Sequence, residues 1–170
     1  MILYHGTNTD IKTINLGMCR PYKDFGTGFY LTSIKEQAIK MAVRISKIHG
    51  GKPIVNIYEA TDDFMTDERL SVKNFGTKAT TEWANFVMNN RNRYYSDFTS
   101  PLCNFDNKYD VVAGPIANDD LAFVFRQYES GLMSLENLLV ELEYKEVTNQ
   151  YSFHTEKALQ LLKKVGVSYE

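Results

Sequence analysis

The segment FGTGFYLT at residues 25–32 sets two glycines directly before a run of aromatic and aliphatic residues. Glycines at this spacing favour a tight turn, and the aromatic run is typical of a strand. We therefore expect a turn at residues 25–28 that leads into a strand containing Tyr30. The segment YHGT at residues 4–7 follows an apolar start and predicts the end of a first strand. These two segments organise our interpretation of the whole chain.

The rest of the chain adds strand and helix patterns without strict alternation. This order favours an α+β fold with a largely antiparallel, split sheet and surrounding helices over a doubly wound fold. There is no repeat, low-complexity tract or linker, so residues 1–170 are expected to form one domain. Expected strands lie near 54–59, 70–75, 109–113, 150–153 and 167–169. Expected helices lie near 34–48, 118–128, 134–142 and 155–165, and a further helix, marked by Trp83, Phe86 and Val87, begins near Thr81.

Helix starts and faces follow from local signals. Ser33 and Glu36 predict a capping box, and Asn118 predicts a helix N-cap. One apolar stripe is expected to bury the first long helix: Ile34, Ala38, Met41, Ala42, Ile45 and Ile48.

The composition is that of an ordinary globular protein, with 44% hydrophobic and 24% charged residues. A formal net charge of −2 excludes a global basic field that would attract nucleic acid. The one dense basic cluster is Arg91 and Arg93, followed by Tyr94 and Tyr95. We interpret this cluster first as a solvated loop after a helix, and second as a patch for phosphate or nucleic acid.

Several classes of site have no support in the sequence. Cys19 and Cys103 lack the paired spacing of a zinc site, a redox site or a disulfide framework. The three histidines are scattered without nearby carboxylates, so no metal site is predicted. No apolar run could span a membrane and no secretory signal is visible. We expect a soluble, cytoplasmic protein.

The two opening segments suit a pocket for a planar amide such as nicotinamide. Gly6, Gly26 and Gly28 carry no Cβ, so a ligand could approach the backbone there. Tyr30 offers an aromatic face for stacking, and His5 at a strand end can hydrogen-bond a ribose hydroxyl. The alternative without a ligand is that His5 is simply an exposed histidine and that the glycine segment is an ordinary turn.

Taken together and in this order, the segments resemble the ADP-ribosyltransferase fold of the His-Tyr-Glu type, which includes diphtheria toxin and the poly(ADP-ribose) polymerases. The chain is most similar to a bacterial family of unknown function, DUF3990. The resemblance covers almost the whole chain and rests on the segments at residues 4–7, 24–32, 83–87, 109–117 and 150–153.

The resemblance implies NAD as co-substrate and a role for each matching residue. His5 would hold the adenosine ribose, the Gly6 backbone would bind the nicotinamide amide, and Tyr30 would stack on the nicotinamide ring. Gln150 would lie beside the nicotinamide ribose, which makes His5, Tyr30 and Gln150 the expected catalytic set. Three further NAD contacts are expected: Thr7 at the ribose, Arg20 at the pyrophosphate and Gly28 in the glycine turn.

Two departures from the polymerase pattern weaken the expected chemistry. Gln150 stands where those enzymes have glutamate, and a neutral amide stabilises positive charge on the ribose less than an anion does. Ala38 and Met41 stand where they have serine and a second tyrosine. We interpret Met41 first as part of the core stripe, and second as a residue whose sulfur packs on the ligand ring. Asp24 is expected to stabilise the turn. As an alternative, Asp24 or the pair Asp119 and Asp120 substitutes for the missing acid.

The resemblance implies an NAD-dependent mono-ADP-ribosyltransferase that acts on a macromolecular acceptor, either protein or nucleic acid. Such an enzyme could be a bacterial toxin restrained by a neutralising partner protein. Two alternatives remain open at this point. One is an NAD glycohydrolase that uses water as acceptor, and the other is a catalytically weak module that binds ADP-ribose or a partner.

Overall fold

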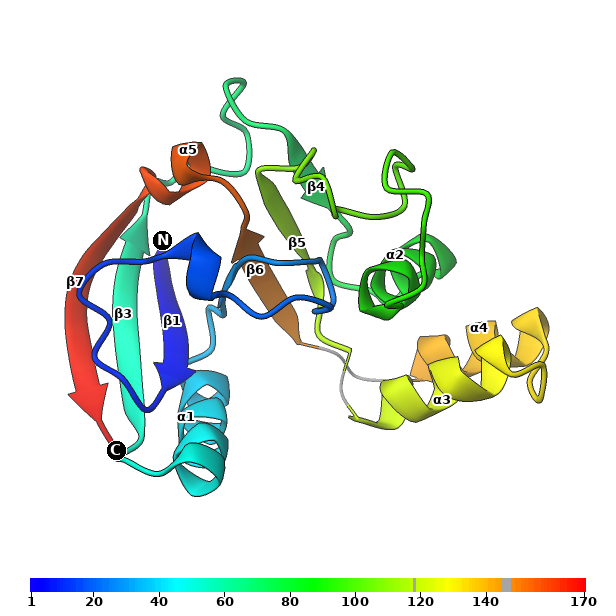
Figure 1. The fold of residues 1–170 in the computed structure, drawn as a ribbon, viewed down its shortest axis with the longest axis horizontal. Coiled ribbons are helices and arrows are strands. Elements are labelled where there is room, and N and C mark those ends of the chain that lie inside the picture. Colours follow the sequence, from blue (N-terminus) through cyan, green and yellow to red (C-terminus); the bar gives the residue numbers. More distant parts are fainter. Residues whose placement is uncertain (118, 145–147) are drawn as a thin grey trace.

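The computed structural model describes residues 1–117, 119–144 and 148–170, and the side chains of residues 119, 143 and 144 are outside this description. Its strands form two separate sheets, shown side by side in Figure 1. The three-stranded sheet has the order β1-β3-β7, from β1 (Ile2–Thr7), β3 (Ile54–Ala60) and β7 (Leu162–Tyr169). The four-stranded sheet has the order β2-β6-β5-β4, from β2 (Phe29–Leu31), β6 (Asn149–Phe153), β5 (Val111–Pro115) and β4 (Val72–Asn74).

The helices lie around these sheets, and the fold class is α+β as expected. The short 3-10 helix Leu16–Met18 lies in the long segment between β1 and β2. The α-helices are α1 (Lys35–His49), α2 (Thr81–Arg91), α3 (Asp119–Glu129), α4 (Leu135–Tyr144) and α5 (Glu156–Leu159). The expected cap Asn118 lies outside the described residues. None of the described helices combines the length and the apolar character needed to cross a membrane.

The two sheets meet where β1 passes β2. A bridge pairs Tyr4 with Thr32, and each of the two residues donates its backbone N–H to the carbonyl of the other, at 2.8 and 3.0 Å. All strand pairs are antiparallel except β4 with β5, so the sheets are largely antiparallel as expected. The junction brings the segment at residues 4–7 directly against the segment at residues 25–32.

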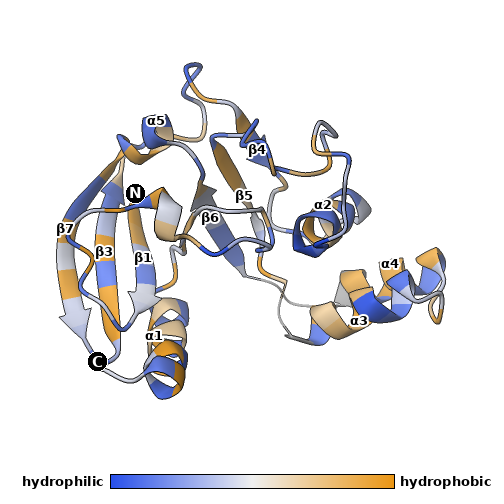
Figure 2. Cartoon of the chain, in the orientation of Figure 1, coloured by the Kyte–Doolittle hydropathy of each residue, from blue (hydrophilic) through white to orange (hydrophobic). Residues whose placement is uncertain are grey.

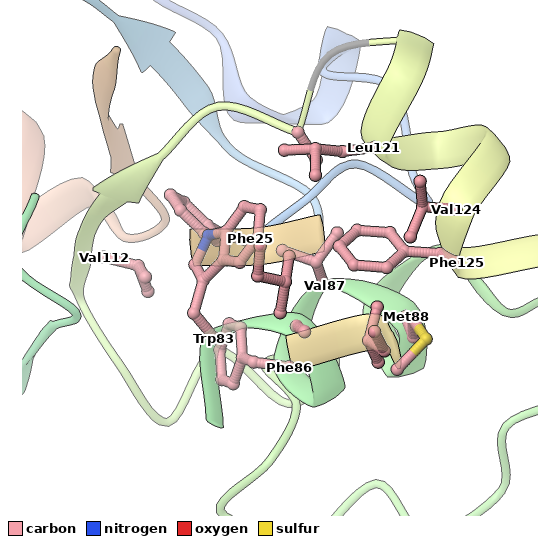
Figure 3. Packing of buried hydrophobic residues seen from close by; sticks show 13 residues of the cluster. Phe25, Trp83, Phe86, Val87, Met88, Val112, Leu121, Val124 and Phe125 are labelled. Carbon is pink, nitrogen blue, oxygen red and sulfur yellow. The ribbon is translucent and has the colours of Figure 1, made fainter. Parts of the chain in front are cut away.

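The buried hydrophobic residues gather in separate clusters. One cluster lies under the four-stranded sheet, and Figure 3 shows Phe25 of the glycine turn among side chains from α2, α3 and β5. A second cluster joins the sheets through Leu3, Phe29 and Phe153. β5 is buried at all five positions, and Figure 2 shows the valines at its start in the hydrophobic colour. The glycine turn is therefore anchored in the interior by its own aromatic residue.

Helix α1 differs from the sequence-based expectation at its start and on its buried face. Its N-cap is Ile34, without a side-chain cap, so the predicted Ser33–Glu36 capping box is wrong. Thr32 takes over, because its hydroxyl accepts from the Ile34 N–H and donates to Gln37. Only Ala38 and Ala42 of α1 are buried, whereas Met41 is 48% exposed, so Met41 is not part of the core stripe.

The C-terminal segment is the largest error in the predicted elements. The expected helix over residues 155–165 ends after Leu159, and β7 begins at Leu162. β7 pairs with β3 along its whole length, with an irregularity opposite Ile57 and Tyr58 where Val165 has no partner. Because β3 is the central strand of its sheet, this pairing outweighs the helical spacing of the leucines.

Candidate functional site at the junction of the two sheets

His5 lies on β1 at the sheet junction and is fixed by the backbone of β2. Its Nδ1 is 2.8 Å from the Tyr30 carbonyl oxygen, and its ring stacks on Phe29 with centroids 4.5 Å apart. A carbonyl only accepts, so Nδ1 carries the proton and Nε2 is left as a hydrogen-bond acceptor. Burial lowers the His5 pKa, against the opposing effect of the Tyr30 carbonyl. His5 is therefore a neutral imidazole with one acceptor nitrogen.

The backbone of Gly6 faces the junction rather than the neighbouring strand. Met1 accepts from the Ala60 N–H of the neighbouring strand, whereas Tyr4 exchanges its backbone hydrogen bonds with Thr32 on the opposite side. Hydrogen-bonded residues alternate along an antiparallel strand, so the Gly6 N–H and C=O point the same way as those of Tyr4. Past the bridge, the edge of β1 thus presents one donor and one acceptor.

Gly6 lacks a Cβ for the sake of packing. A Cβ built there would lie 1.9 Å from the Ala38 carbonyl oxygen of α1. Gly28 is similar, since its Cβ would lie 2.6 Å from Nδ1 of His154. Gly26 has a φ of +93°, a conformation that favours glycine. The space expected for a ligand at Gly6 and Gly28 is therefore filled by the protein itself.

The glycine turn closes around the hydroxyl group of Tyr30. This hydroxyl donates to the Gly26 carbonyl at 2.7 Å and accepts from the Phe25 N–H at 2.9 Å. Burial, together with the nearby Asp24 carboxylate, raises the Tyr30 pKa well above its usual value. His154 contacts the ring edge-on, with centroids 6.4 Å apart. Tyr30 therefore acts as a fixed neutral ring, and its hydroxyl does not serve as a general acid.

Gln150 opens β6 on the same face as Tyr30. Ser152 pairs with Tyr30, and Gln150 lies two residues before it on the same side of the strand. The Gln150 Nε2 donates to Asp24 Oδ2 at 2.8 Å and to the Pro115 carbonyl at 3.4 Å. With Nε2 committed to these acceptors, the Oε1 end of the amide is turned away from Asp24.

Asp24 is the centre of a buried polar network that the sequence did not reveal. Arg91 donates to Oδ1 through Nε and Nη2, at 2.9 and 2.6 Å, and also binds the Ala117 carbonyl. The Ala117 N–H and Gln150 both donate to Oδ2. Both carboxylate oxygens are satisfied, so Asp24 stabilises more than its own turn. It joins the turn to α2, β6 and the chain after β5.

Arg91 also corrects an expectation. It is the last residue of α2 and is partly buried against Asp24, so the interpretation of Arg91 as part of a solvated loop is wrong. The following residues, Arg93 and Tyr94, are exposed. Asp120 is exposed on α3, and the side chain of Asp119 lies outside the described residues.

His154 is a second residue whose role the sequence left open. It is 2% exposed, with Nδ1 2.8 Å from the Thr27 carbonyl and Nε2 2.8 Å from the Ser152 hydroxyl. Burial lowers its pKa to about 4, while the Thr27 carbonyl and Asp110 act in the opposite direction. Residues 150 and 152 lie on one face of β6, and His154, one residue past its end, continues the same alternation. His154 therefore stabilises the glycine turn through its contact with the Thr27 carbonyl.

The remaining predicted residues divide between the junction and the surface. Thr7 ends β1, two residues beyond His5 on the same strand face. Arg20 is exposed, and its Nη2 is 3.1 Å from Nε2 of His49 at the end of α1. Within residues 1–117, 119–144 and 148–170, no hydrogen bond or ion pair joins Arg20 to His5, Tyr30 or Gln150. In the same ranges, no cluster of three or more His, Cys, Asp or Glu side chains is arranged to hold a metal ion.

The family model described as "Protein of unknown function (DUF3990)" matches residues 1–164, nearly the whole chain and all of the junction. The chain belongs to the DUF3990 family. No curated protein and no solved structure gives a significant match. This DUF3990 protein thus has at its sheet junction a neutral histidine, a fixed tyrosine ring, a free strand edge and a glutamine oriented by a buried carboxylate.

Proposed function

We propose that this protein is an NAD-dependent mono-ADP-ribosyltransferase whose site lies at the junction of the two sheets. The observation that carries the proposal is the contact between His5 and Tyr30, made across the junction through the Tyr30 carbonyl at 2.8 Å. It brings His5, with its acceptor nitrogen, and the free edge of β1 against the backbone of β2, the strand that carries the Tyr30 ring. A dinucleotide offers a matching hydroxyl, amide and ring.

Each group has a chemical role toward NAD. The His5 Nε2 accepts from a hydroxyl of the adenosine ribose. The Gly6 N–H and C=O match the C=O and NH₂ of the nicotinamide carboxamide, in the manner of an added strand. The Tyr30 ring stacks on the nicotinamide, and Thr7 adds a hydroxyl on the ribose side. These contacts bind and orient NAD at the junction.

Gln150 acts on the nicotinamide ribose. Since Asp24 and Pro115 hold its Nε2, its Oε1 accepts from the ribose 2′-hydroxyl. As the bond between C1′ and nicotinamide breaks, nicotinamide leaves with the electron pair and positive charge grows on the ribose. The carbonyl dipole of Gln150 stabilises that charge. The acceptor nucleophile then bonds to C1′ and releases its proton to solvent.

A neutral group at this position favours transfer of a single ADP-ribose over chain building. Among the described residues, Asp24 is the one carboxylate that binds Gln150, and its charge is already compensated by Arg91. This arrangement also favours a second candidate function, a catalytically weak module that binds ADP-ribose. The two candidates share the binding site and differ in turnover.

The test is incubation of the purified protein with NAD and a cell lysate, followed by mass spectrometry for free nicotinamide and for ADP-ribose adducts. A transferase releases nicotinamide and leaves single ADP-ribose adducts on a macromolecule, and Tyr30→Ala abolishes both. Nicotinamide release without adducts indicates a glycohydrolase. Binding of NAD without nicotinamide release indicates the binding module.

A further inference from the structure

A groove between α2 and α3 lies outside the junction and is not lined by its residues. It has a volume of about 700 Å³, and its lining includes Arg91, Arg93 and Arg126 against one acid, Glu129. Tyr94 and Phe125 add aromatic surface. Its lining comes from the end of α2, the residues that follow α2, and the middle and end of α3; both helices are labelled in Figure 1.

The arginines of the groove differ in their engagement. Arg91 is bound to Asp24, whereas Arg93 and Arg126 have no carboxylate partner within the described residues. The Cζ atom of Arg93 instead lies 5.4 Å from the centroid of the Tyr22 ring, and that of Arg126 lies 6.0 Å from the centroid of the Phe123 ring. A guanidinium that rests on an aromatic face keeps its N–H groups at the edge for a phosphate. Two cations are thus presented to the groove by stacking.

Tyr94 supplies the second half of the recognition chemistry. Its side chain is 93% exposed, next to Arg93 in the sequence and on the lip of the same groove. A nearly bare tyrosine ring beside arginines matches sites that stack a base and hold the adjoining phosphates. An acidic peptide would use the arginines but would leave this ring without a partner.

The groove connects to the site at the junction through one chain of contacts. Arg91 forms its wall and binds Asp24, and Asp24 binds Gln150 at 2.8 Å. Arg93 rests on Tyr22, two residues before Asp24. A ligand in the groove therefore lies on the Gln150 side of the junction, where the ribose C1′ of NAD would be.

We propose that this groove binds single-stranded nucleic acid, with phosphates at Arg93 and Arg126 and a base stacked on Tyr94. That this strand is the ADP-ribose acceptor rests on the proposed function. The binding itself does not depend on NAD. The net charge of −2 agrees with a local patch rather than a general affinity for polyanions.

The binding test is fluorescence anisotropy at low salt with a labelled single-stranded oligonucleotide of roughly twelve nucleotides. The double variant Arg93→Glu/Arg126→Glu should bind at least about tenfold more weakly. The control Lys40→Glu/Arg44→Glu makes the same charge change at exposed positions on α1 and should bind like the parent protein. At roughly 0.7 per phosphate contact, two contacts predict a slope of about −1.4 for log affinity against log salt concentration.

Tyr94 separates stacking from charge. Tyr94→Ala should weaken binding about fivefold or more, while Tyr94→Phe keeps the ring and should keep the affinity. Equal losses in the groove and control variants, no binding by the parent protein, or displacement of the oligonucleotide by polyglutamate of equal charge would each overturn the proposal.

The acceptor assignment has its own readout. The parent protein with NAD and the oligonucleotide should yield an oligonucleotide heavier by one ADP-ribose, and the groove variant should not. The groove variant should keep the thermal shift caused by NAD, which shows that the junction is intact. Binding of the oligonucleotide without modification, while nicotinamide is released, would overturn the acceptor role alone. An absent NAD shift in the parent protein would refute the proposed function and leave the anisotropy result to decide on the groove.

Discussion

The two ends of the junction are built in opposite ways. At the His5 end, a single hydrogen bond to the Tyr30 carbonyl fixes the side chain and leaves Nε2 and the Gly6 backbone facing the junction. At the Gln150 end, Asp24 receives four hydrogen bonds from Arg91, Ala117 and Gln150. One end leaves polar groups for a ligand, whereas the other commits them to the protein. Under the proposed function, this contrast predicts that NAD binding depends on the His5 end and that Gln150 makes a modest contribution to catalysis.

Substitution of Gly6, at the His5 end of the junction, should have the largest effect on stability. In Gly6→Ala the new Cβ falls 1.9 Å from the Ala38 carbonyl, so β1 and α1 must separate. We expect a loss of more than about 3 kcal/mol in the free energy of unfolding, measured by chemical denaturation. Gly166→Ala is the matched control on β7, since its Cβ meets only Ile57 at 3.7 Å, and should be nearly neutral. Equal stability of the two variants would show that α1 does not pack on Gly6 as described.

Removing the Asp24 carboxylate tests the Gln150 end of the junction. Asp24→Ala leaves the Arg91 guanidinium and the Gln150 amide without their acceptor in a buried setting. We expect a cost of about 3 kcal/mol in unfolding free energy. Asp62→Ala removes a fully exposed carboxylate paired with the N-terminus and should leave the thermal midpoint essentially unchanged. A similarly small effect of Asp24→Ala would mean that the network does not hold the turn.

Acid should loosen the glycine turn through His154. Its pKa in the folded protein is about 4, below the ordinary 6.5, so the unfolded chain binds a proton that the native state rejects. The contribution of neutral His154 to the free energy of unfolding is therefore fully present above pH 6.5. It is lost as the pH drops from 6.5 toward 4, by up to about 3 kcal/mol. Burial lowers the His5 pKa as well and adds to the same slope.

The pH dependence has a simple control. Unfolding measured at several pH values in His154→Gln should lose much of the slope between pH 6.5 and 4, whereas His49→Gln, at an exposed helix end, should keep it. An unchanged slope in His154→Gln would assign the acid sensitivity to other groups.

Gln150 gives the smallest expected effect and the sharpest comparison with the glutamate of the polymerases. Gln150→Ala should lower turnover more than affinity for NAD, by about 1 kcal/mol or several-fold, in steady-state assays of nicotinamide release. Gln150→Glu should not act as a gain of function, because it sets a second carboxylate beside Asp24 in place of a donor. A strongly activated Gln150→Glu enzyme would contradict this account of the network.

The sequence predicted the parts of the fold that depend on local signals. The glycine turn, the strand holding Tyr30 and the largely antiparallel, split arrangement follow from the segments at residues 4–7 and 25–32. The strand β7 could not be predicted in full, because Leu161 and Leu162 also fit the helical spacing that begins before them, and only pairing with β3 decides for a strand. Met41 was misplaced because a helical stripe does not show how wide the buried face is.

The site was less predictable than the fold. The two-residue spacing of Gln150, Ser152 and His154, along β6 and one residue past its end, could have shown that they share a face. The Asp24–Arg91 ion pair joins residues 67 positions apart, and no local pattern signals such a contact. The glycines were interpreted as space for a ligand, but α1 and His154 occupy two of those spaces. A glycine that packing requires cannot be told in a sequence from a glycine that makes room for a ligand.

The central claim is that the junction of His5 and Tyr30 binds NAD, and thermal unfolding with and without NAD tests it most directly. NAD should raise the thermal midpoint of the parent protein, because it binds only the native state. Tyr30→Ala should abolish the shift, while Tyr169→Ala, which removes an exposed tyrosine at the end of β7, should retain it. A full NAD shift in Tyr30→Ala, or no shift in the parent protein at saturating NAD, would contradict the account.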